Sequence, residues 1–387
     1  MIHSQRLLQL KERKLIDSGI AKLAILKFFT TGALVMLVLF FVRPVQAQEL
    51  NSNRLALPVQ LFEDFYTLYE NELGSVRPCQ DNVGLYEYKV CSKALRNEGN
   101  SPFILYSKGM PSANGKRQIA PIVVLFHGLS DSPFYIRSIA EHLNDKGFTV
   151  VAPLTPGNGK LDAANDMRDP TLQQRWYAHV DSIMNLISPY SDKTYIGGFS
   201  TGGTLATRYM LLHPDEIDGL LLFSGALALS ESAENLGQIW GMKWIAKIVD
   251  GDFVSTGANP YRYPDVAGYA GLTLADVIFE IRYLLAETTV SKPIFVAHSL
   301  ADIITPYYGV EDLMAKIDGE HQVMTIDRSY DMCHQDLVMS SMMMIGLKID
   351  KTQLNISERC AIPKPNPLFN NMMAMLDYFF EQQLKGQ

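Results

Sequence analysis

The chain has 387 residues, of which 47% are hydrophobic and 19% charged, proportions that are typical of a globular protein and exclude a disordered chain. This length allows one large α/β domain or two smaller ones. Residues 1–47 hold seven Lys and Arg against two Asp and Glu, so residues 48–387 hold 27 against 39, a net charge of −12. Such an acidic body repels nucleic acid and anionic membrane surfaces, so neither is an expected partner.

The first 47 residues have the pattern of an export signal. A basic stretch precedes the uncharged, apolar residues 28–42, and Val45 and Ala47 occupy the −3 and −1 positions of a cleavage site. The alternative is an uncleaved membrane anchor, because residues 23–42 nearly span a bilayer if Lys27 snorkels. In both cases the basic flank stays inside, so we expect a periplasmic or secreted body.

Four cysteines fit an oxidising compartment. None belongs to a Cys-x-x-Cys pair, so we expect no zinc site. Of the three pairings that four cysteines allow, we favour the local one, Cys79 with Cys91 and Cys333 with Cys360. Four buried free thiols are the alternative.

The order of elements predicts an α/β fold. Residues 48–118 form an N-terminal extension, with a helix over 57–73 and short strands over 85–90 and 103–107. From residue 119 strands and helices alternate, which predicts a parallel sheet with right-handed crossovers. The expected strands are 122–126, 148–152, 195–199, 217–223, 294–297 and 323–326, and the clearest helices are 133–146 and 172–187.

Residues 227–290 interrupt this alternation. They contain helical patterns without a convincing strand, and they separate the two parts of the core, 119–226 and 291–387. An insertion at this point lies over the mouth of a site at the carboxyl ends of the strands, so we interpret it as a helical lid. Most of its apolar side chains should pack within the insertion, while Trp240 and Trp244 are our candidates for substrate contact.

A nucleophile is indicated by Gly198-Phe199-Ser200-Thr201-Gly202, between an apolar strand and a helix. A serine on such a turn projects its hydroxyl at the positive end of the helix. The hydroxyl needs a base to take its proton and a carboxylate to orient that base. Asp302 follows the strand 294–297 and His334 follows the strand 323–326, which makes Ser200, Asp302 and His334 the predicted catalytic triad.

Other acids and histidines are weaker candidates for the triad. Asp327 and Asp331 are the alternative acids, although they fit turn positions better. His127 is the alternative base, but we interpret it as shaping the turn after the strand 122–126. The remaining histidines of the body fit surface or packing positions, precede the acid, or lie at the wrong edge of the sheet; they are His142, His179, His213, His298 and His321.

The oxyanion needs two backbone donors. The N–H of Thr201, directly after the nucleophile, is one candidate. The N–H of Leu129, in the loop His127-Gly128-Leu129-Ser130-Asp131-Ser132-Pro133, is the other. We expect Ser130 and Asp131 only to cap the following helix.

Together, the loop at 127–133, the turn around Ser200, Asp302 and His334 resemble the α/β-hydrolase superfamily. The most similar branch is that of the carboxylesterases and monoacylglycerol lipases, which groups with the serine aminopeptidase-like hydrolases, and the resemblance covers residues 119–340 and a closing helix at 366–383. It implies an eight-stranded, mostly parallel sheet, a lid after the sixth strand, and ester hydrolysis through an acyl-enzyme without metal or cofactor. The chain departs from this branch at Asn158, where histidine is common, in a longer stretch at 340–365, and in residues 48–100, which have no counterpart.

The favoured function is therefore an exported serine esterase for small or medium acyl chains, either a carboxylesterase or a monoacylglycerol lipase-like enzyme. A peptidase, amidase or acyltransferase with the same triad is the alternative, and Glu231 or Glu234 would then hold a free amino terminus. A non-catalytic binding protein is disfavoured because all three triad residues are present. The sequence leaves open the acyl length, the physiological ester and the oligomeric state.

Overall fold

The computed structural model describes residues 59–79, 86–107, 119–354 and 359–384. The expected signal peptide or anchor, residues 1–47, lies outside these ranges. None of the helices in the described ranges combines the length and the apolar character that crossing a bilayer requires.

A single nine-stranded sheet forms the centre of the described body, with the strand order β1-β2-β3-β5-β4-β6-β7-β8-β9. The strands from β5 to β9 in this order pair in parallel, whereas β1, β2 and β3 pair antiparallel at one edge. Their bounds are β1 Val76–Pro78, β2 Glu87–Ser92, β3 Phe103–Leu105, β4 Ile122–Phe126, β5 Thr149–Ala152, β6 Thr194–Phe199, β7 Gly219–Phe223, β8 Ile294–Ser299 and β9 His321–Ile326.

The predicted fold class is confirmed, with one strand more than the eight expected. The additional strand is β1, which has three residues and pairs only with β2. Pro78 lacks a backbone donor and is tolerated there because β1 is an edge strand.

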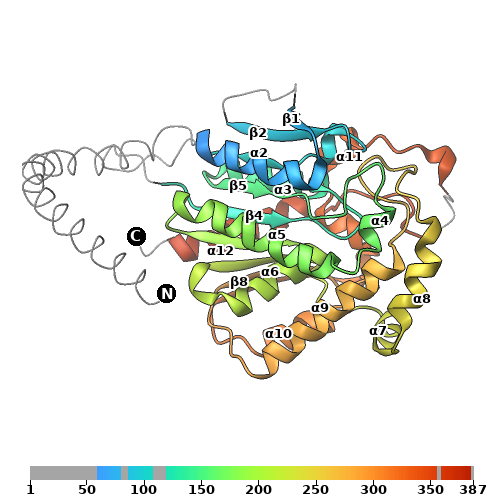
Figure 1. Cartoon of the computed structure of the whole chain (residues 1–387). Helices are drawn as coiled ribbons and strands as arrows, with labels where there is room; N and C mark the ends of the chain where they lie inside the picture. The colour runs from blue at the N-terminus through green and yellow to red at the C-terminus, as the bar shows by residue number, and fades with distance from the viewer. Residues whose placement is uncertain (1–58, 80–85, 108–118, 355–358, 385–387) are drawn as a thin grey trace, which may run out of the picture. The chain divides into compact units, whose positions relative to one another are not determined.

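Helices cover both faces of the sheet, because the central strands are apolar on both sides. Buried side chains of α2, α5, α6 and α10 pack on one face, and those of α3, α11 and α12 pack on the other. Figure 1 shows α2, α5 and α6 in front of the sheet. The bounds are α2 Val59–Leu73, α3 Arg137–Asp145, α4 Ala164–Met167, α5 Leu172–Ile187, α6 Thr201–Leu212, α10 Tyr308–Met314, α11 Ser341–Gly346 and α12 Phe369–Leu384.

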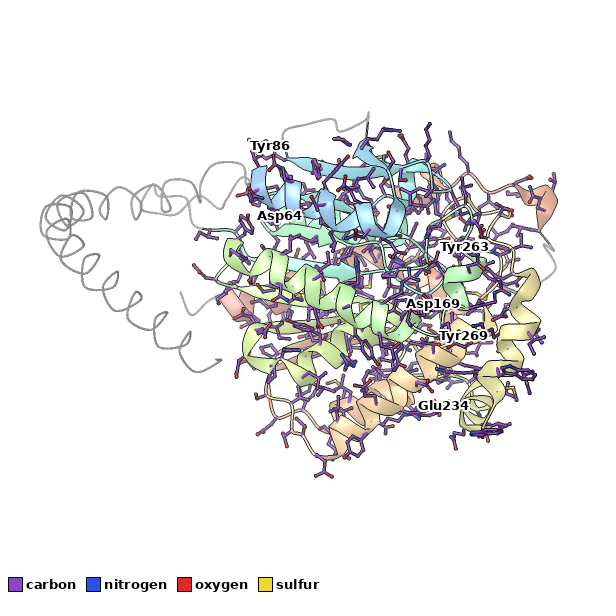
Figure 2. The ribbon with its side chains drawn as sticks, viewed as in Figure 1. Asp64, Tyr86, Asp169, Glu234, Tyr263 and Tyr269 are labelled. Atoms are coloured by element: carbon purple, nitrogen blue, oxygen red, sulfur yellow. A yellow bond between two sulfur atoms is a disulfide. The ribbon has the colours of Figure 1, made fainter. Side chains whose placement is uncertain are left out.

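The insertion after β7 is helical, as the sequence predicts. It consists of α7 Glu231–Gln238, α8 Met242–Val249 and α9 Gly268–Ala286, and the chain then returns to the sheet as β8. In Figure 1 these three helices gather at the lower right, and in Figure 2 the side chains of Glu234 on α7 and Tyr269 on α9 lie among them.

Two disulfides join the pairs that the sequence favours, and the described residues contain no free cysteine. Cys79 with Cys91 links the end of β1 to β2, with the two Cα atoms 5.0 Å apart. Cys333 with Cys360 attaches a C-terminal segment to the loop after β9, with the Cα atoms 5.8 Å apart. The second bond therefore lies directly beside His334.

Candidate active site

Ser200 lies on a sharp turn between β6 and α6. Its backbone has φ 54° and ψ −121°, a conformation that costs a non-glycine residue about 1–3 kcal/mol. A Cβ atom on Gly198 or Gly202 would collide with the carbonyl oxygen of Phe126 on the neighbouring strand β4. The two glycines therefore allow the turn to pack closely, and the turn presents the Ser200 hydroxyl at the amino end of α6.

Asp302 and His334 form the strongest polar contact of the site. Asp302 Oδ2 lies 2.6 Å from His334 Nδ1, and both side chains are buried. Burial alone would raise the pKa of Asp302, but the charge of His334 and its hydrogen bond outweigh burial and lower the pKa well below its ordinary value. Because the carboxylate accepts, Nδ1 carries the proton and Nε2 is left as the base.

Thr305 completes the support of this pair. Its hydroxyl donates to Asp302 Oδ2 at 2.9 Å and lies 3.2 Å from His334 Nδ1, while its backbone N–H donates to Asp302 Oδ1 at 3.1 Å. Sequence reasoning missed Thr305. Its only signal was its position three residues after the predicted acid.

Ser200 and His334 line the same cavity, and Asp302 contacts His334. The three predicted residues therefore lie at one edge of the sheet. This convergence follows from topology, because Ser200, Asp302 and His334 follow β6, β8 and β9, which run in the same direction. Within the described residues, the Ser200 hydroxyl makes no hydrogen bond to His334. Such bonds are often long in proteins without substrate and shorten when substrate binds.

The alternative acids, Asp327 and Asp331, and the alternative base, His127, make other contacts than those of a catalytic triad. Asp327 is exposed and caps a short helix through the N–H of Ser329, and Asp331 is exposed and paired with Arg359. His127 Nε2 accepts the N–H of Thr155 at 3.0 Å, so its Nδ1 must carry the proton that it donates to Gly128 O. Burial lowers the pKa of His127 to about 4, which fits a neutral structural ring.

The predicted oxyanion donors lie at the same cavity. Leu129 and Thr201 are both buried and line it together with Ser200. The loop that carries Leu129 is fixed through its neighbour Ser130, whose N–H donates to Asn158 Oδ1 at 2.9 Å and whose carbonyl accepts the N–H of Tyr263 at 2.9 Å. Asn158, which the sequence marks only as a departure from the pattern of the similar hydrolases, thus holds the loop that carries the predicted oxyanion donor Leu129.

The capping roles expected for Ser130 and Asp131 are wrong. The Ser130 hydroxyl donates to Asp265 O at 3.2 Å, and Asp131 Oδ1 lies 3.4 Å from Arg262 Nε. Burial raises the pKa of Asp131, although the charges of Arg262 and His334 oppose the change. Contacts from the segment after α8, far along the chain, therefore replace the local cap.

The cavity at Ser200 has a volume of about 430 Å³ and is mostly apolar. The insertion supplies Leu236, Met242 and Leu274, while Leu129 and Ile304 come from loops of the core. A cavity with apolar walls and a few polar groups is typical of a site for a small ligand.

Trp240 and Trp244, the predicted substrate contacts, do not lie at the cavity. Trp240 is 98% exposed and Trp244 is 68% exposed, and neither lines the cavity. On α8 the residues that face the cavity are Met242 and Ala246, four positions apart, and Trp244 projects from another side of the helix. The apolar pattern of the sequence predicts helical structure here, but it does not predict which side of α8 faces the core.

Comparisons with known proteins show what this chain is similar to. Residues 117–265 match the model of the family described as "Serine aminopeptidase, S33", a range that contains Ser200 and Leu129 but neither Asp302 nor His334. A thermostable monoacylglycerol lipase from Bacillus sp. (strain H-257) is 23% identical over 215 residues, which are 55% of this chain and 84% of that protein.

The chain is also similar to solved structures. One, described as "LipS and LipT, two metagenome-derived lipolytic enzymes", has a TM-score of 0.50 and 18% identity, and the match covers 72% of this chain and 97% of that one. The monoacylglycerol lipase of Paleococcus ferrophilus has a TM-score of 0.46 and 19% identity, over 67% of this chain and 95% of that one.

Proposed function

We propose that this chain, which is similar over residues 117–265 to the serine aminopeptidase-like family and over 215 residues to a monoacylglycerol lipase, is an exported enzyme that hydrolyses carboxylic esters of small or medium acyl chains. Ser200 would be the nucleophile, His334 the base and Asp302 the residue that orients the base. The observation that carries the proposal is the 2.6 Å bond between Asp302 and His334 in a cavity that His334 shares with Ser200.

The chemistry follows from the arrangement of these side chains. The Ser200 hydroxyl attacks the ester carbonyl carbon while His334 Nε2 takes its proton, and the N–H groups of Leu129 and Thr201 stabilise the oxyanion. The protonated His334 then gives its proton to the departing alcohol, which leaves an acyl-enzyme. Water attacks the acyl-enzyme with His334 again as base, and the carboxylic acid is released as Ser200 regains its proton.

The cavity supports the proposed acyl range. Its volume of about 430 Å³ and its apolar walls suit an acyl chain of small or medium length. The monoacylglycerol lipase relative is consistent with a glycerol-type ester, although its identity of 23% leaves the ester of this chain as a proposal.

The carboxylates that a peptidase would use are engaged or remote. Glu234 accepts two bonds from Arg282, at 2.6 and 3.0 Å, and one from the N–H of Leu229 at 2.9 Å. Glu231 is exposed and does not line the cavity. Neither lines the cavity, so the structure does not support the peptidase role that the sequence offers these two residues.

Export is supported by the charge pattern of residues 1–47 and by the two disulfides, which form in oxidising compartments. The mass of the exported protein tests it. Loss of residues 1–47 supports a cleaved signal, and a full-length membrane-bound product supports an anchor.

The catalytic proposal is tested with a fluorophosphonate probe and a series of 4-nitrophenyl esters. We expect the wild type to be labelled and Ser200→Ala to be unlabelled and at least ~10⁴-fold slower. Ser232→Ala, which alters an exposed serine of α7, is the matched control and should behave as the wild type. Equal labelling of Ser200→Ala would reject the proposed nucleophile.

A further inference from the structure

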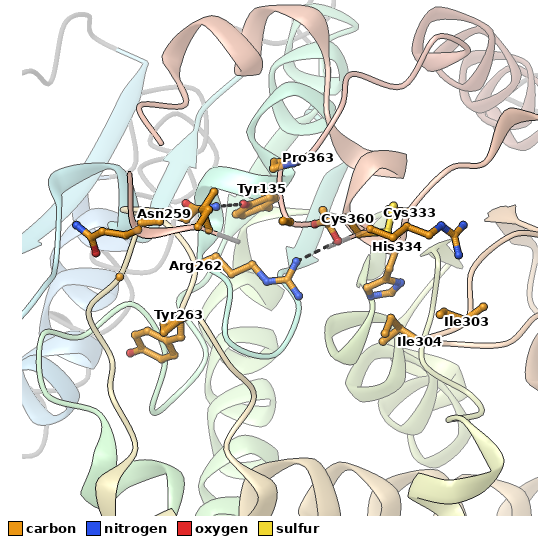
Figure 3. Close-up of a pocket in the computed structure, with 18 of the residues that line it drawn as sticks. Tyr135, Asn259, Arg262, Tyr263, Ile303, Ile304, Cys333, His334, Cys360 and Pro363 are labelled. Carbon is orange, nitrogen blue, oxygen red and sulfur yellow. Dashed lines mark hydrogen bonds between the residues drawn. A yellow bond between two sulfur atoms is a disulfide. The ribbon is translucent and has the colours of Figure 1, made fainter. Parts of the chain in front are cut away.

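A second cavity lies beside His334 and has a different character. It has a volume of about 560 Å³, and it shares His334, Arg262, Ile303 and Ile304 with the apolar cavity. Figure 3 shows it with the side chain of Arg262 pointing toward His334 and with the disulfide of Cys333 and Cys360 next to His334. The two cavities therefore meet at the proposed base.

Three segments that are distant in sequence form the walls of this second cavity, which we call the polar cavity because its lining is less apolar than that of the cavity at Ser200. They are the loop at 256–264 before α9, the loop at 301–304 after β8, and the residues around Cys360. Side-chain contacts fix the first and the third of these segments to other residues that line the cavity. Asn259 Nδ2 donates to the Tyr135 hydroxyl at 2.6 Å, and Gln335 Nε2 donates to Cys360 O at 2.8 Å.

Apart from His334, the charged residues that line the polar cavity are Arg262 and Arg359, and the described residues that line it include no Asp or Glu. The ion-pair partner of Arg359, Asp331, is exposed to solvent, and the partner of Arg262, Asp131, lies at the apolar cavity. A ligand in the polar cavity would therefore meet two guanidinium groups, each with one carboxylate partner that does not line this cavity.

Arg262 has hydrogen-bond capacity left over. Its Nε faces Asp131 at 3.4 Å and its Nη1 donates to Gln335 Oε1 at 3.3 Å. A guanidinium has five N–H donors, and its remaining N–H groups have no hydrogen-bond partner among the described residues. The backbone of Arg262 is held in place, because its carbonyl oxygen accepts a hydrogen bond from Arg96 Nη1 at 2.8 Å.

We propose that the polar cavity binds the alcohol half of the ester, and that Arg262 binds an anionic oxygen group, a carboxylate or a phosphate, on that alcohol. The inference rests on the proposed esterase function. His334 must reach the departing oxygen, so the alcohol lies on the His334 side while the acyl chain occupies the apolar cavity. A guanidinium pairs with both carboxylate and phosphate through parallel N–H bonds.

The test compares esters that share an acyl group and differ in the charge of the alcohol. One pair is 1-octanoylglycerol and 1-octanoylglycerol 3-phosphate, and the other is phenyl butanoate and 3-(butanoyloxy)benzoate. We expect kcat/KM of the wild type to be about 10- to 100-fold higher for the anionic member of at least one pair. A preference in the first pair alone identifies phosphate, in the second alone carboxylate, and both results support the proposal.

Arg262→Met should reduce this preference to about 1, and Arg262→Lys should keep part of it. The matched control is Arg137→Met on α3, because Arg137 is 23% exposed against 26% for Arg262 and lines neither cavity. The ratio within each pair is the readout, so a general loss of activity does not imitate the effect. The wild-type preference should also fall as salt is raised, which tests the proposal even when a variant is unstable.

Equal kcat/KM within both pairs, or a preference that Arg262→Met retains, would overturn the inference. If the wild type still cleaves the neutral esters through Ser200, the proposed function stands and only the anionic alcohol is rejected. If no ester is cleaved in a Ser200-dependent way, the proposed function is rejected and this inference with it.

Discussion

Replacing Asn158 with alanine should slow catalysis although Asn158 touches no triad residue. Its Oδ1 accepts the N–H of Ser130 at 2.9 Å, and its Nδ2 donates to the carbonyls of Thr155 at 3.2 Å and Pro156 at 3.3 Å. The alanine variant removes all three bonds and leaves the buried N–H of Ser130 without its acceptor. That N–H belongs to the residue directly after Leu129, the proposed oxyanion donor.

The size of the effect follows from these bonds. A buried N–H without a partner costs about 1–3 kcal/mol, and the two longer bonds of Nδ2 add less, so the free energy of unfolding should fall by about 2–4 kcal/mol. Complete loss of one oxyanion donor lowers kcat by about 10²–10³. Because Tyr263 still holds the carbonyl of Ser130 at 2.9 Å, we expect a smaller decrease in kcat, of about 10- to 100-fold.

The assay measures kcat and KM with 4-nitrophenyl butanoate, together with unfolding in urea. Asn144→Ala is the matched control, since Asn144 Nδ2 also donates to two backbone carbonyls, at 3.2 and 2.9 Å, but lies at the end of α3 and lines neither cavity. It should lose stability and keep kcat. If Asn158→Ala is equally destabilised and keeps the wild-type kcat, Asn158 supports the fold without positioning the oxyanion loop.

Three further predictions concern the effect of pH on stability, the exposed tryptophans of the helical insertion, and the disulfide beside His334. Burial lowers the pKa of His127 to about 4 and that of His179 to about 3, below the ordinary value of 6.5. Both side chains therefore bind protons more readily in the unfolded chain, so the urea concentration at the midpoint of unfolding should fall as pH drops from about 6.5 toward 4. A midpoint that does not change with pH would contradict the burial of these two histidines. Trp240→Ser and Trp244→Ser should each keep kcat/KM for soluble esters within about twofold of the wild type, and the free energy of unfolding within about 0.5 kcal/mol, because both side chains are exposed. A large rise in KM would show that these side chains contact the substrate. Replacing both Cys333 and Cys360 with alanine should lower the free energy of unfolding by about 2–4 kcal/mol in urea titrations, and an unaltered midpoint would argue against the bond.

The parts of the fold that the sequence predicts are those with local signals. The strand β4 and the helix α5 have the bounds expected from their apolar patterns, since a fully buried strand and an amphipathic helix depend on neighbouring residues. The positions of Ser200, Asp302 and His334 follow from which strand each one ends, so parallel topology is enough to bring them to one edge.

What the sequence could not predict depends on contacts between distant segments. The roles of Asn158 and Thr305 depend on where their loops meet Ser130 and His334, and no spacing in the chain encodes that distance. The orientation of Trp244 depends on how α8 rotates against α9, which tertiary packing decides. The strand β1 was missed because three residues ending in proline give almost no periodic pattern.

The helix α2 of the N-terminal extension contacts the loop that precedes Asn158. The Tyr69 hydroxyl of α2 accepts the N–H of Leu154 at 2.8 Å, and Glu72 Oε1 accepts the N–H of Gly157 at 3.3 Å. Glu72 is itself held by Arg175 of α5 at 2.8 Å through each of its oxygens. Because Asn158 follows Gly157 directly, α2 fixes the loop that in turn fixes the oxyanion loop. Part of the N-terminal extension therefore supports the proposed active site, and a truncation that removes α2 should lower kcat for 4-nitrophenyl esters as well as stability.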